Sequence, residues 1–194
     1  MKKLGGSSKV KVAVFISGKG SNLKKLIKYS LRENAKFQIS LIVSSNLKAL
    51  GLKYAKQFNI KKKIINYKNK KIMEKDLIIK LQKERINIIC LAGFMKIISK
   101  NFIKKFKGKI INIHPSLLPK YKGLNTHSRV INNKERYSGC TVHYVNHKID
   151  SGKIILQKKI RVKKNESVRS IQKRVLEVEH KIYHKAIKKA LSSF

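Results

Sequence analysis

The sequence predicts an α/β protein with a Rossmann-like, open and mostly parallel sheet flanked by helices. Short runs of β-branched and other apolar residues alternate along the chain with longer segments in which apolar residues recur at helical spacing. The first run ends at a glycine pair that leads directly into a helical segment. The chain has 194 residues, 42% of them hydrophobic, which suits one sizeable core. We therefore expect a single domain over residues 1–194.

Each expected strand is a short apolar run bounded by turn residues, and each expected helix has one apolar side. The residues before Lys9, positions 1–8, are expected to form a loose tail. The expected strands cover residues 10–16, 37–44, 63–65, 86–92, 110 to about 115, 137–145 and 154–157. The expected helices cover residues 21–31, with Ser21 as N-cap, 47–58, 71–84, 101–106 and the chain from 167 onward. Side chains expected to face the sheet from these helices include Leu50, Tyr54, Ala55, Ile72, Leu77, Ile78, Leu81, Val168, Ile171, Val175, Val178 and Ile182.

The charge balance is strongly basic, with 48 Lys and Arg residues against nine acidic ones and a net charge of +39. Such a balance suits a nucleic-acid-binding protein. However, lysines occur on every polar face from Lys2 to Lys189, and lysine greatly outnumbers arginine, the residue suited to bidentate phosphate recognition. A coding bias over an ordinary enzyme explains this pattern better, so specific nucleic-acid binding is not expected. A positive field that attracts anionic substrates remains open.

No apolar run reaches the roughly eighteen residues of a membrane span, and the N-terminus lacks a signal-peptide core. We expect a soluble, cytoplasmic protein without a membrane partner, either a monomer or a homodimer. Cys90 and Cys140 are far apart, with neither Cys-x-x-Cys spacing nor a nearby set of histidines. They are expected to be buried, reduced thiols, so neither a disulfide nor a metal site is expected.

A glycine turn, Gly18-Lys19-Gly20-Ser21-Asn22, joins the first strand to the first helix. A strand, a glycine turn and a helix start together present free backbone N–H groups and a positive dipole end, which is a site for phosphate. The alternative is that the turn only connects the two elements. Leu23 replaces the third glycine of a dinucleotide-binding loop, and the Gly-Lys-Ser/Thr of a P-loop is absent, so a nicotinamide or ATP cofactor is not expected.

A polar pair, Asn112 and His114, closes the strand that stops at Pro115. Residues two apart on a strand share a face, so an amide and an imidazole lie together at a carboxyl end, where open α/β sheets bind ligands. The alternative is that the pair satisfies loop backbone groups. Asp150, one of two aspartates, precedes the turn at Gly152, and its local sequence favours an Asx-turn residue.

The segment 112–119, Asn-Ile-His-Pro-Ser-Leu-Leu-Pro, with Tyr121, Gly123, Thr126 and His127 after it, resembles the signature of the folate-dependent formyltransferase family. The resemblance extends from about Val10 to His184 and is greatest to members that act on glycinamide ribonucleotide. It implies the formyltransferase fold and transfer of the formyl group of 10-formyltetrahydrofolate to the amine of that ribonucleotide in de novo purine biosynthesis. It also implies direct acyl transfer without a metal.

The resemblance implies a role for each matching residue. Asn112 and a protonated His114 would stabilise the oxyanion, and Asp150 would assist proton transfer, with Pro115 and His143 as supporting residues. Residues 18–22 would bind the ribonucleotide phosphate, and Glu179 its ribose hydroxyls. Locally, Glu179 could equally be an exposed partner for Lys or Arg. The folate-binding residues would be Met95, Lys96, Ile97, Ile98 and Asn112, although Phe94 and Met95 could instead be core residues.

Two lysines depart from the family pattern. Lys96 stands where arginine is common, and it could meet the folate glutamate tail only as a point charge. Lys122 stands where proline is common, which predicts a less rigid turn. Two other functions remain open. One is a different folate-dependent formyl enzyme, a tRNA formyltransferase core or a deformylase, although we expect either to carry an additional domain. The other is a nucleic-acid-binding protein on an enzyme fold, which only the charge supports.

Overall fold

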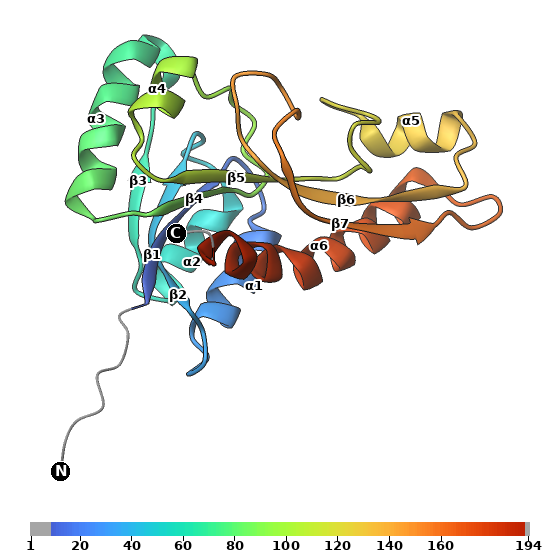
Figure 1. Ribbon diagram of the computed structural model, residues 1–194, viewed down its shortest axis with the longest axis horizontal. Coiled ribbons are helices and arrows are strands. Elements are labelled where there is room, and N and C mark those ends of the chain that lie inside the picture. The colour runs from blue at the N-terminus through green and yellow to red at the C-terminus, as the bar shows by residue number, and fades with distance from the viewer. Residues whose placement is uncertain (1–8, 193–194) are drawn as a thin grey trace.

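The computed structural model describes residues 9–192, which form a seven-stranded sheet in the order β3-β2-β1-β4-β5-β6-β7 (Figure 1). The strands are β1 (Val10–Ile16), β2 (Phe37–Ser44), β3 (Lys61–Ile64), β4 (Ile88–Leu91), β5 (Lys109–His114), β6 (Tyr137–Tyr144) and β7 (Ile154–Arg161). β1 to β5 pair in parallel, whereas β6 runs antiparallel to β5 and β7. This arrangement confirms the predicted open, mostly parallel sheet. The expected tail lies outside the described residues, and the single-domain organisation stays a prediction.

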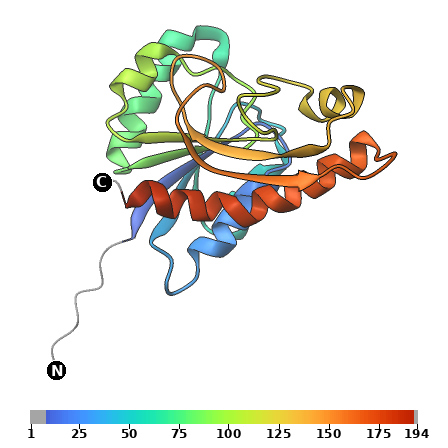
Figure 2. The same ribbon diagram turned by 45° about the vertical axis from the view of Figure 1, so that its right-hand side comes forward.

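Helices cover both faces of the sheet (Figure 1 and Figure 2). α1 (Ser21–Ser30), α2 (Lys53–Gln57) and α6 (Val168–Leu191) pack on one face, and α3 (Lys70–Lys83) and α4 (Lys100–Lys105) on the other. α5 (Thr126–Asn132) contacts α6, and two short 3-10 helices, η1 (Leu50–Leu52) and η2 (Tyr67–Asn69), complete the helical elements of the described residues. Successive side chains of β1 point to opposite faces of the sheet and enter the two hydrophobic cores. Val12 and Val14 face the first group of helices, and Ala13 and Phe15 face the second. None of the helices within residues 9–192 has the length and apolar character needed to cross a bilayer.

The structure corrects several expected helix positions. Gly20 caps α1 with a left-handed φ of 71°, so Ser21 is its first residue and not its N-cap. The helix expected at 47–58 is divided between η1 and α2, because the Gly51 N–H donates to the Gly18 carbonyl at 3.0 Å and binds this segment to the glycine turn. Leu50, 63% exposed, therefore points to solvent. Ile72 and Val168 lie in the first turns of α3 and α6 and are also partly or largely exposed, whereas Met73 and Ile171 are buried.

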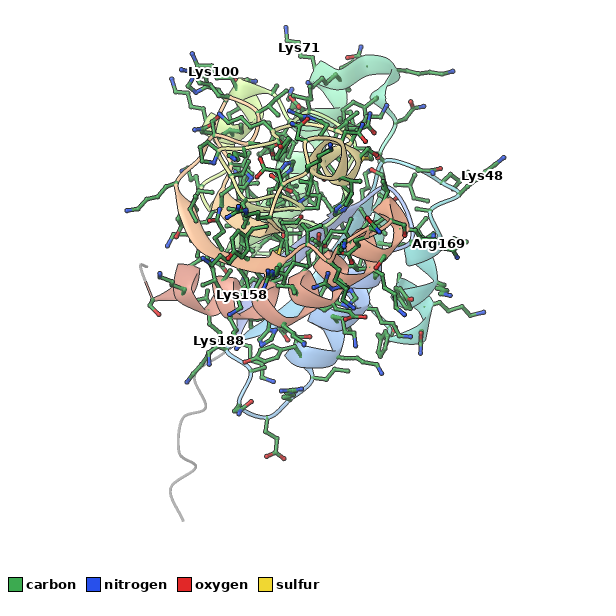
Figure 3. All side chains as sticks on the ribbon, turned by 90° about the vertical axis from the view of Figure 1, so that its right-hand side faces the viewer. Lys48, Lys71, Lys100, Lys158, Arg169 and Lys188 are labelled. Carbon is green, nitrogen blue, oxygen red and sulfur yellow. The ribbon has the colours of Figure 1, made fainter. Side chains whose placement is uncertain are left out.

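The basic side chains do not gather on one face of the molecule. Figure 3 shows Lys48, Lys71, Lys100, Lys158, Arg169 and Lys188 projecting from widely separated parts of the fold. They belong to a loop, to α3, to α4, to β7 and to the two ends of α6. Both edge strands also carry lysines, at Lys61 to Lys63 in β3 and at Lys158 and Lys159 in β7, where charge hinders pairing with another sheet edge.

Tyr183 links α6 to the middle of the sheet. Its ring is 1% exposed, and its hydroxyl donates to the Leu91 carbonyl at 2.8 Å. We expect Tyr183→Phe to lower the free energy of unfolding by about 1 to 2 kcal/mol, because a buried hydrogen bond is lost while the ring still packs. Denaturant titration measures the change, with Tyr137→Phe, an exposed tyrosine, as the matched control. Equal stability of the two variants would contradict the role given to this hydrogen bond.

Candidate active site

The carboxyl ends of β1, β4 and β5 meet at one edge of the sheet. Phe15 of β1 is paired with Leu91 of β4, and Leu91 with Asn112 of β5, so the loops that follow these strands emerge side by side. Hydrogen bonds join two of the loops. The Ser17 N–H donates to the Gly93 carbonyl at 3.0 Å, and the Met95 N–H donates to the Ser17 hydroxyl at 2.8 Å. The glycine turn and the 93–98 segment are therefore neighbours at the edge that carries Asn112 and His114.

Asp150 lies at the centre of this edge, although it is 36 positions beyond His114 in the chain. It belongs to the loop between β6 and β7, which curves back over β5 (Figure 1). One carboxylate oxygen, Oδ2, is 3.3 Å from His114 Nδ1, and the other, Oδ1, is 3.4 Å from Asn112 Nδ2. The carboxylate side chain is 11% exposed. The structure thus brings the three expected catalytic side chains together.

His143 completes the wall of the site from β6. It stands opposite Asn112 in the antiparallel β5–β6 pair, which places its Nε2 3.3 Å from Asn112 Nδ2 and 3.6 Å from Asp150 Oδ1. Its other ring nitrogen, Nδ1, donates to the Tyr144 carbonyl at 2.8 Å. Because a carbonyl can only accept, Nδ1 carries the hydrogen, and in the neutral ring Nε2 is an acceptor for the Asn112 amide. This contact orients the Asn112 amide.

The turn formed by residues 121–123 holds both His114 and Asp150 through backbone groups. The Tyr121 carbonyl lies 2.9 Å from His114 Nε2, and the Gly123 N–H donates to Asp150 Oδ2 at 2.9 Å. Since the carbonyl can only accept, His114 Nε2 carries a hydrogen and Nδ1 is the nitrogen that faces the carboxylate. A proton taken up by the imidazole therefore arrives next to Asp150.

Burial controls the charge of His114. It lowers the pKa of the imidazole below its usual value, and although the Tyr121 carbonyl and the Asp150 carboxylate act in the opposite direction, they do not reverse the effect. Burial alone would raise the pKa of Asp150, but the neighbouring His143, the Gly123 N–H and His114 hold it below its usual value. The resting site therefore contains an ionised Asp150 and a neutral His114. The expected role of a protonated His114 toward the oxyanion concerns the reaction itself and stays a prediction; in the resting site burial outweighs the carboxylate neighbour.

Glu179 is buried against the first turn of α1. Its carboxylate is 7% exposed and accepts a hydrogen bond from Asn22 Nδ2 at 2.6 Å. Burial raises the pKa of Glu179 to about 7, although the Asn22 amide acts to lower it. The alternative of an exposed partner for Lys or Arg is therefore wrong. Gly18 and Lys19 are exposed beside this pair, and Ser21 opens the helix.

The expected folate-binding segment is largely exposed. Met95 and Ile97 are 64% and 65% exposed, so the alternative that Met95 belongs to the core is wrong. Lys96 is also exposed, and its ammonium group lies 5.4 Å from the centre of the Tyr67 ring. Ile98 is half-buried against the core beneath α3 and α4, where Phe94 packs edge-to-face on Phe15.

The turn at Lys122 is held to the loop of Asp150. Lys122 Nζ donates to the Ser151 hydroxyl at 2.9 Å. A lysine therefore supplies a side-chain contact at a position where the missing proline predicted a less rigid turn. Pro115 is half-buried directly after His114, at the end of β5.

Comparison with known proteins decides the family. A model of the formyl transferase family matches residues 10–187, which is most of the chain. The chain belongs to the formyl transferase family. The resemblance seen in the sequence is thereby confirmed.

Two descriptions recur among the relatives of this family member. Phosphoribosylglycinamide formyltransferase of Haemophilus influenzae is 40% identical over 181 residues, which cover 92% of this chain and 85% of that protein. The human trifunctional purine biosynthetic protein adenosine-3 is 41% identical over 182 residues, but this chain spans only 18% of its length. The crystal structure of phosphoribosylglycinamide formyltransferase from Brucella melitensis superposes with a TM-score of 0.89 at 34% identity, covering 94% of this chain and 95% of that one. The formyltransferase fold is confirmed by this match.

Sequence reasoning missed the side chains that hold the 116–118 turn of this formyl transferase. Thr141 of β6 donates through its hydroxyl to the Ser116 carbonyl at 2.7 Å and accepts from the Leu118 N–H at 3.1 Å. Gln157 of β7 donates to the Leu118 carbonyl at 3.0 Å. A polar residue inside a strand-like apolar run, as at Thr141, was the available signal, because a buried hydroxyl needs a partner. Within residues 9–192, no group of three or more His, Cys, Asp or Glu side chains is arranged to hold a metal ion, and the absence of a metal from the reaction stays a prediction.

Glu179 makes stability depend on pH. Its pKa rises from 4.5 to about 7 on folding, so the folded state binds the proton more tightly and Glu179 stabilises the fold most below its unfolded pKa. This contribution, on the order of 3 kcal/mol, is lost as pH rises through about 7. We expect Glu179→Gln to remove this part of the pH dependence. Denaturation of both proteins at about pH 5 and about pH 8 measures it, and identical pH dependence would contradict the buried, protonated state.

Proposed function

We propose that this chain transfers the formyl group of 10-formyltetrahydrofolate to the amine of glycinamide ribonucleotide, a step of de novo purine biosynthesis. The observation that carries the proposal is the convergence of Asn112, His114 and Asp150 at the sheet edge that also bears the glycine turn. The similarity to phosphoribosylglycinamide formyltransferases over more than 90% of the chain supports the same substrates. The location expected from the sequence, and a monomeric or homodimeric state, stay predictions.

The glycine turn and Glu179 suit the two ends of a ribonucleotide. The turn of residues 18–22 opens α1 without a side-chain cap, which leaves backbone N–H groups of its first turn for a phosphate. Asn22 joins this turn to Glu179 directly, so an acceptor for ribose hydroxyls lies one hydrogen bond from the proposed phosphate site. The positive surface would attract the anionic substrate.

The 95–98 segment suits the planar, largely apolar folate. Met95 and Ile97 present large apolar side chains to solvent beside the catalytic edge, and such exposure is common at ligand sites. The Lys96 ammonium group lies over the Tyr67 ring. It would meet the carboxylates of the folate glutamate tail as a point charge. Ile98 would support this segment from the core side.

The chemistry would be direct acyl transfer. The substrate amine attacks the formyl carbon, a new carbon–nitrogen bond forms, and the bond to the folate nitrogen breaks while that nitrogen receives the proton that the amine loses. Asn112 Nδ2 is suited to the developing oxyanion, because its present contacts of 3.3 and 3.4 Å are longer than usual hydrogen bonds and readily exchanged. His114 would take up the amine proton on Nδ1 beside Asp150 and then pass it to the leaving folate nitrogen, and while charged it would stabilise the oxyanion through its positive charge.

Substitution of the catalytic residues tests the proposal. We expect His114→Ala and Asp150→Asn to lower kcat by about a hundred-fold or more, because each removes a preorganised group of the proton path. Asparagine accepts the left-handed φ of 46° at position 150, so Asp150→Asn should fold. The assay measures formyl transfer from 10-formyltetrahydrofolate to glycinamide ribonucleotide, with water and charged methionyl-tRNA as competing acceptors. Wild-type transfer by folded His114→Ala would overturn the assignment.

The glycine turn can be tested at Gly18 more cleanly than at Gly20. A Cβ on Gly20 would lie 2.7 Å from Gly51 Cα at a φ of 71°, so a bulky residue there would damage the fold as well as the site. A Cβ on Gly18 meets nothing within 4 Å. We expect Gly18→Leu to keep the stability of the wild type and the KM for folate, and to raise the KM for the ribonucleotide about ten-fold or more. An unchanged ribonucleotide KM would exclude the proposed phosphate site.

A further inference from the structure

The turn that orients His114 and Asp150 has an unusual backbone conformation. Tyr121 has a φ of 57°, in the left-handed region that a bulky side chain rarely adopts. Its carbonyl accepts from His114, and two residues later the Gly123 N–H donates to Asp150. Such a conformation persists only where the surroundings impose it. The contacts that impose it therefore also determine the geometry of both acid–base groups.

These contacts come from α5 and from the turn that follows it. The Tyr121 hydroxyl donates to Glu135 Oε1 at 2.8 Å and accepts from Asn133 Nδ2 at 2.9 Å. The Arg129 guanidinium lies 5.0 Å from the centre of the Tyr121 ring and donates to the Lys122 carbonyl at 2.8 Å. The ring is thus held at its hydroxyl and on one face, and the following peptide is held as well.

Glu135 is a second anchor for the same segment. Lys120 Nζ donates to Glu135 Oε1 at 2.8 Å, and this hydrogen bond, with that from Tyr121, lowers the pKa of the Glu135 carboxyl. An ionised acceptor makes both hydrogen bonds stronger than neutral ones. The Ser116 hydroxyl donates to the Lys120 carbonyl at 2.7 Å, so the segment is also fixed on its other side. One carboxylate therefore holds two successive residues, Lys120 and Tyr121.

We propose that Glu135 and Tyr121 are positioning residues for formyl transfer: Glu135 fixes the left-handed turn at Tyr121, whose carbonyl keeps His114 in the Nε2–H tautomer with Nδ1 toward Asp150. The inference rests on the proposed function of His114. If the turn relaxes, the carbonyl leaves Nε2, and either ring nitrogen of the imidazole can then carry the hydrogen. The Gly123 N–H leaves Asp150 in the same movement. Neither positioning residue needs to touch the substrate for its loss to slow the reaction.

The direction in which the pKa of His114 shifts distinguishes a positioning role from a purely structural one. The groups that face it are Asp150, His143, His127 and Arg129, together with the Tyr121 carbonyl. The carbonyl acts to raise the pKa of His114, so its loss lowers that pKa further. In a variant with a relaxed turn, the limb of the kcat/KM pH profile that reports His114 moves to lower pH. A purely structural defect lowers stability without moving this limb.

Three variants test the proposal by kinetics. We expect Tyr121→Phe and Glu135→Ala to lower kcat between about 10- and 100-fold, with the KM for the ribonucleotide within about two-fold of the wild type. Glu135→Gln keeps an oxygen that accepts from the Tyr121 hydroxyl, so it retains most of the activity. Glu84→Gln is the matched control, because Glu84 also binds two partners, Lys61 and Lys80, and lies outside the site; it keeps wild-type kinetics.

The tautomer of His114 can be measured without any assay of activity. Nitrogen-15 NMR of the imidazole is expected to show a hydrogen on Nε2 in the wild type and a mixture of tautomers in Tyr121→Phe, in which the ring can still stack on Arg129. Folded Tyr121→Phe with the wild-type tautomer and pH limb would overturn the positioning role, even where His114→Ala is inactive and the proposed function stands. Full activity of His114→Ala would instead defeat the proposed function. If Glu135→Ala does not fold, Tyr121→Phe decides the question.

Discussion

The site depends on one constraint, the partly buried carboxylate of Asp150. Its two oxygens face His114, Asn112, His143 and the Gly123 N–H, which come from β5, β6 and the turn after β5. A carboxylate withdrawn from water needs hydrogen-bond donors, which the Asn112 amide and the Gly123 N–H supply here, because an unpaired buried charge is costly. The antiparallel return of β6 and β7 meets this need by directing their connecting loop back across the end of β5. The parallel strands therefore supply the sheet edge that carries Asn112 and His114, and the loop between the antiparallel strands β6 and β7 supplies the carboxylate of Asp150.

Most of the few acidic residues in this chain of net charge +39 have defined partners. Within residues 9–192, six acidic residues form hydrogen bonds or ion pairs with described partners. They are Glu74, Glu84, Glu135, Asp150, Glu166 and Glu179. Among the described residues no lysine or arginine is buried, so the surplus positive charge lies toward the surface, where water and salt screen it. The surplus charge thus lies at the surface, whereas the carboxylate of Asp150 contacts His114 and Asn112 at the sheet edge.

Short runs of apolar and β-branched residues predicted much of the fold. β1 and β2, for example, begin and end where these runs do. Helical periodicity failed at Leu50 and Ile72, because it does not reveal which residues of a first turn reach the sheet. The pairing of Asn112 with His114 followed from strand geometry, whereas Asp150 was found only through resemblance, since its place depends on the return of β6 and β7. The Tyr121 carbonyl and Gly123 N–H are backbone groups without a side-chain signature. The resting charge of His114 depends on burial, which local sequence does not give.

The charge distribution of the resting site also determines the direction in which a proton can move. Burial keeps His114 neutral, its Nε2 hydrogen is directed to Tyr121, and the ionised Asp150 stands beside the free Nδ1. A proton that arrives on Nδ1 forms an ion pair with Asp150, so the cost of charging a buried imidazole is offset at the moment it arises. In the proposed reaction, the positive imidazole would then appear as negative charge develops on the formyl oxygen. Proton transfer and oxyanion stabilisation would become one event, and that coupling requires the imidazole to be neutral at the start.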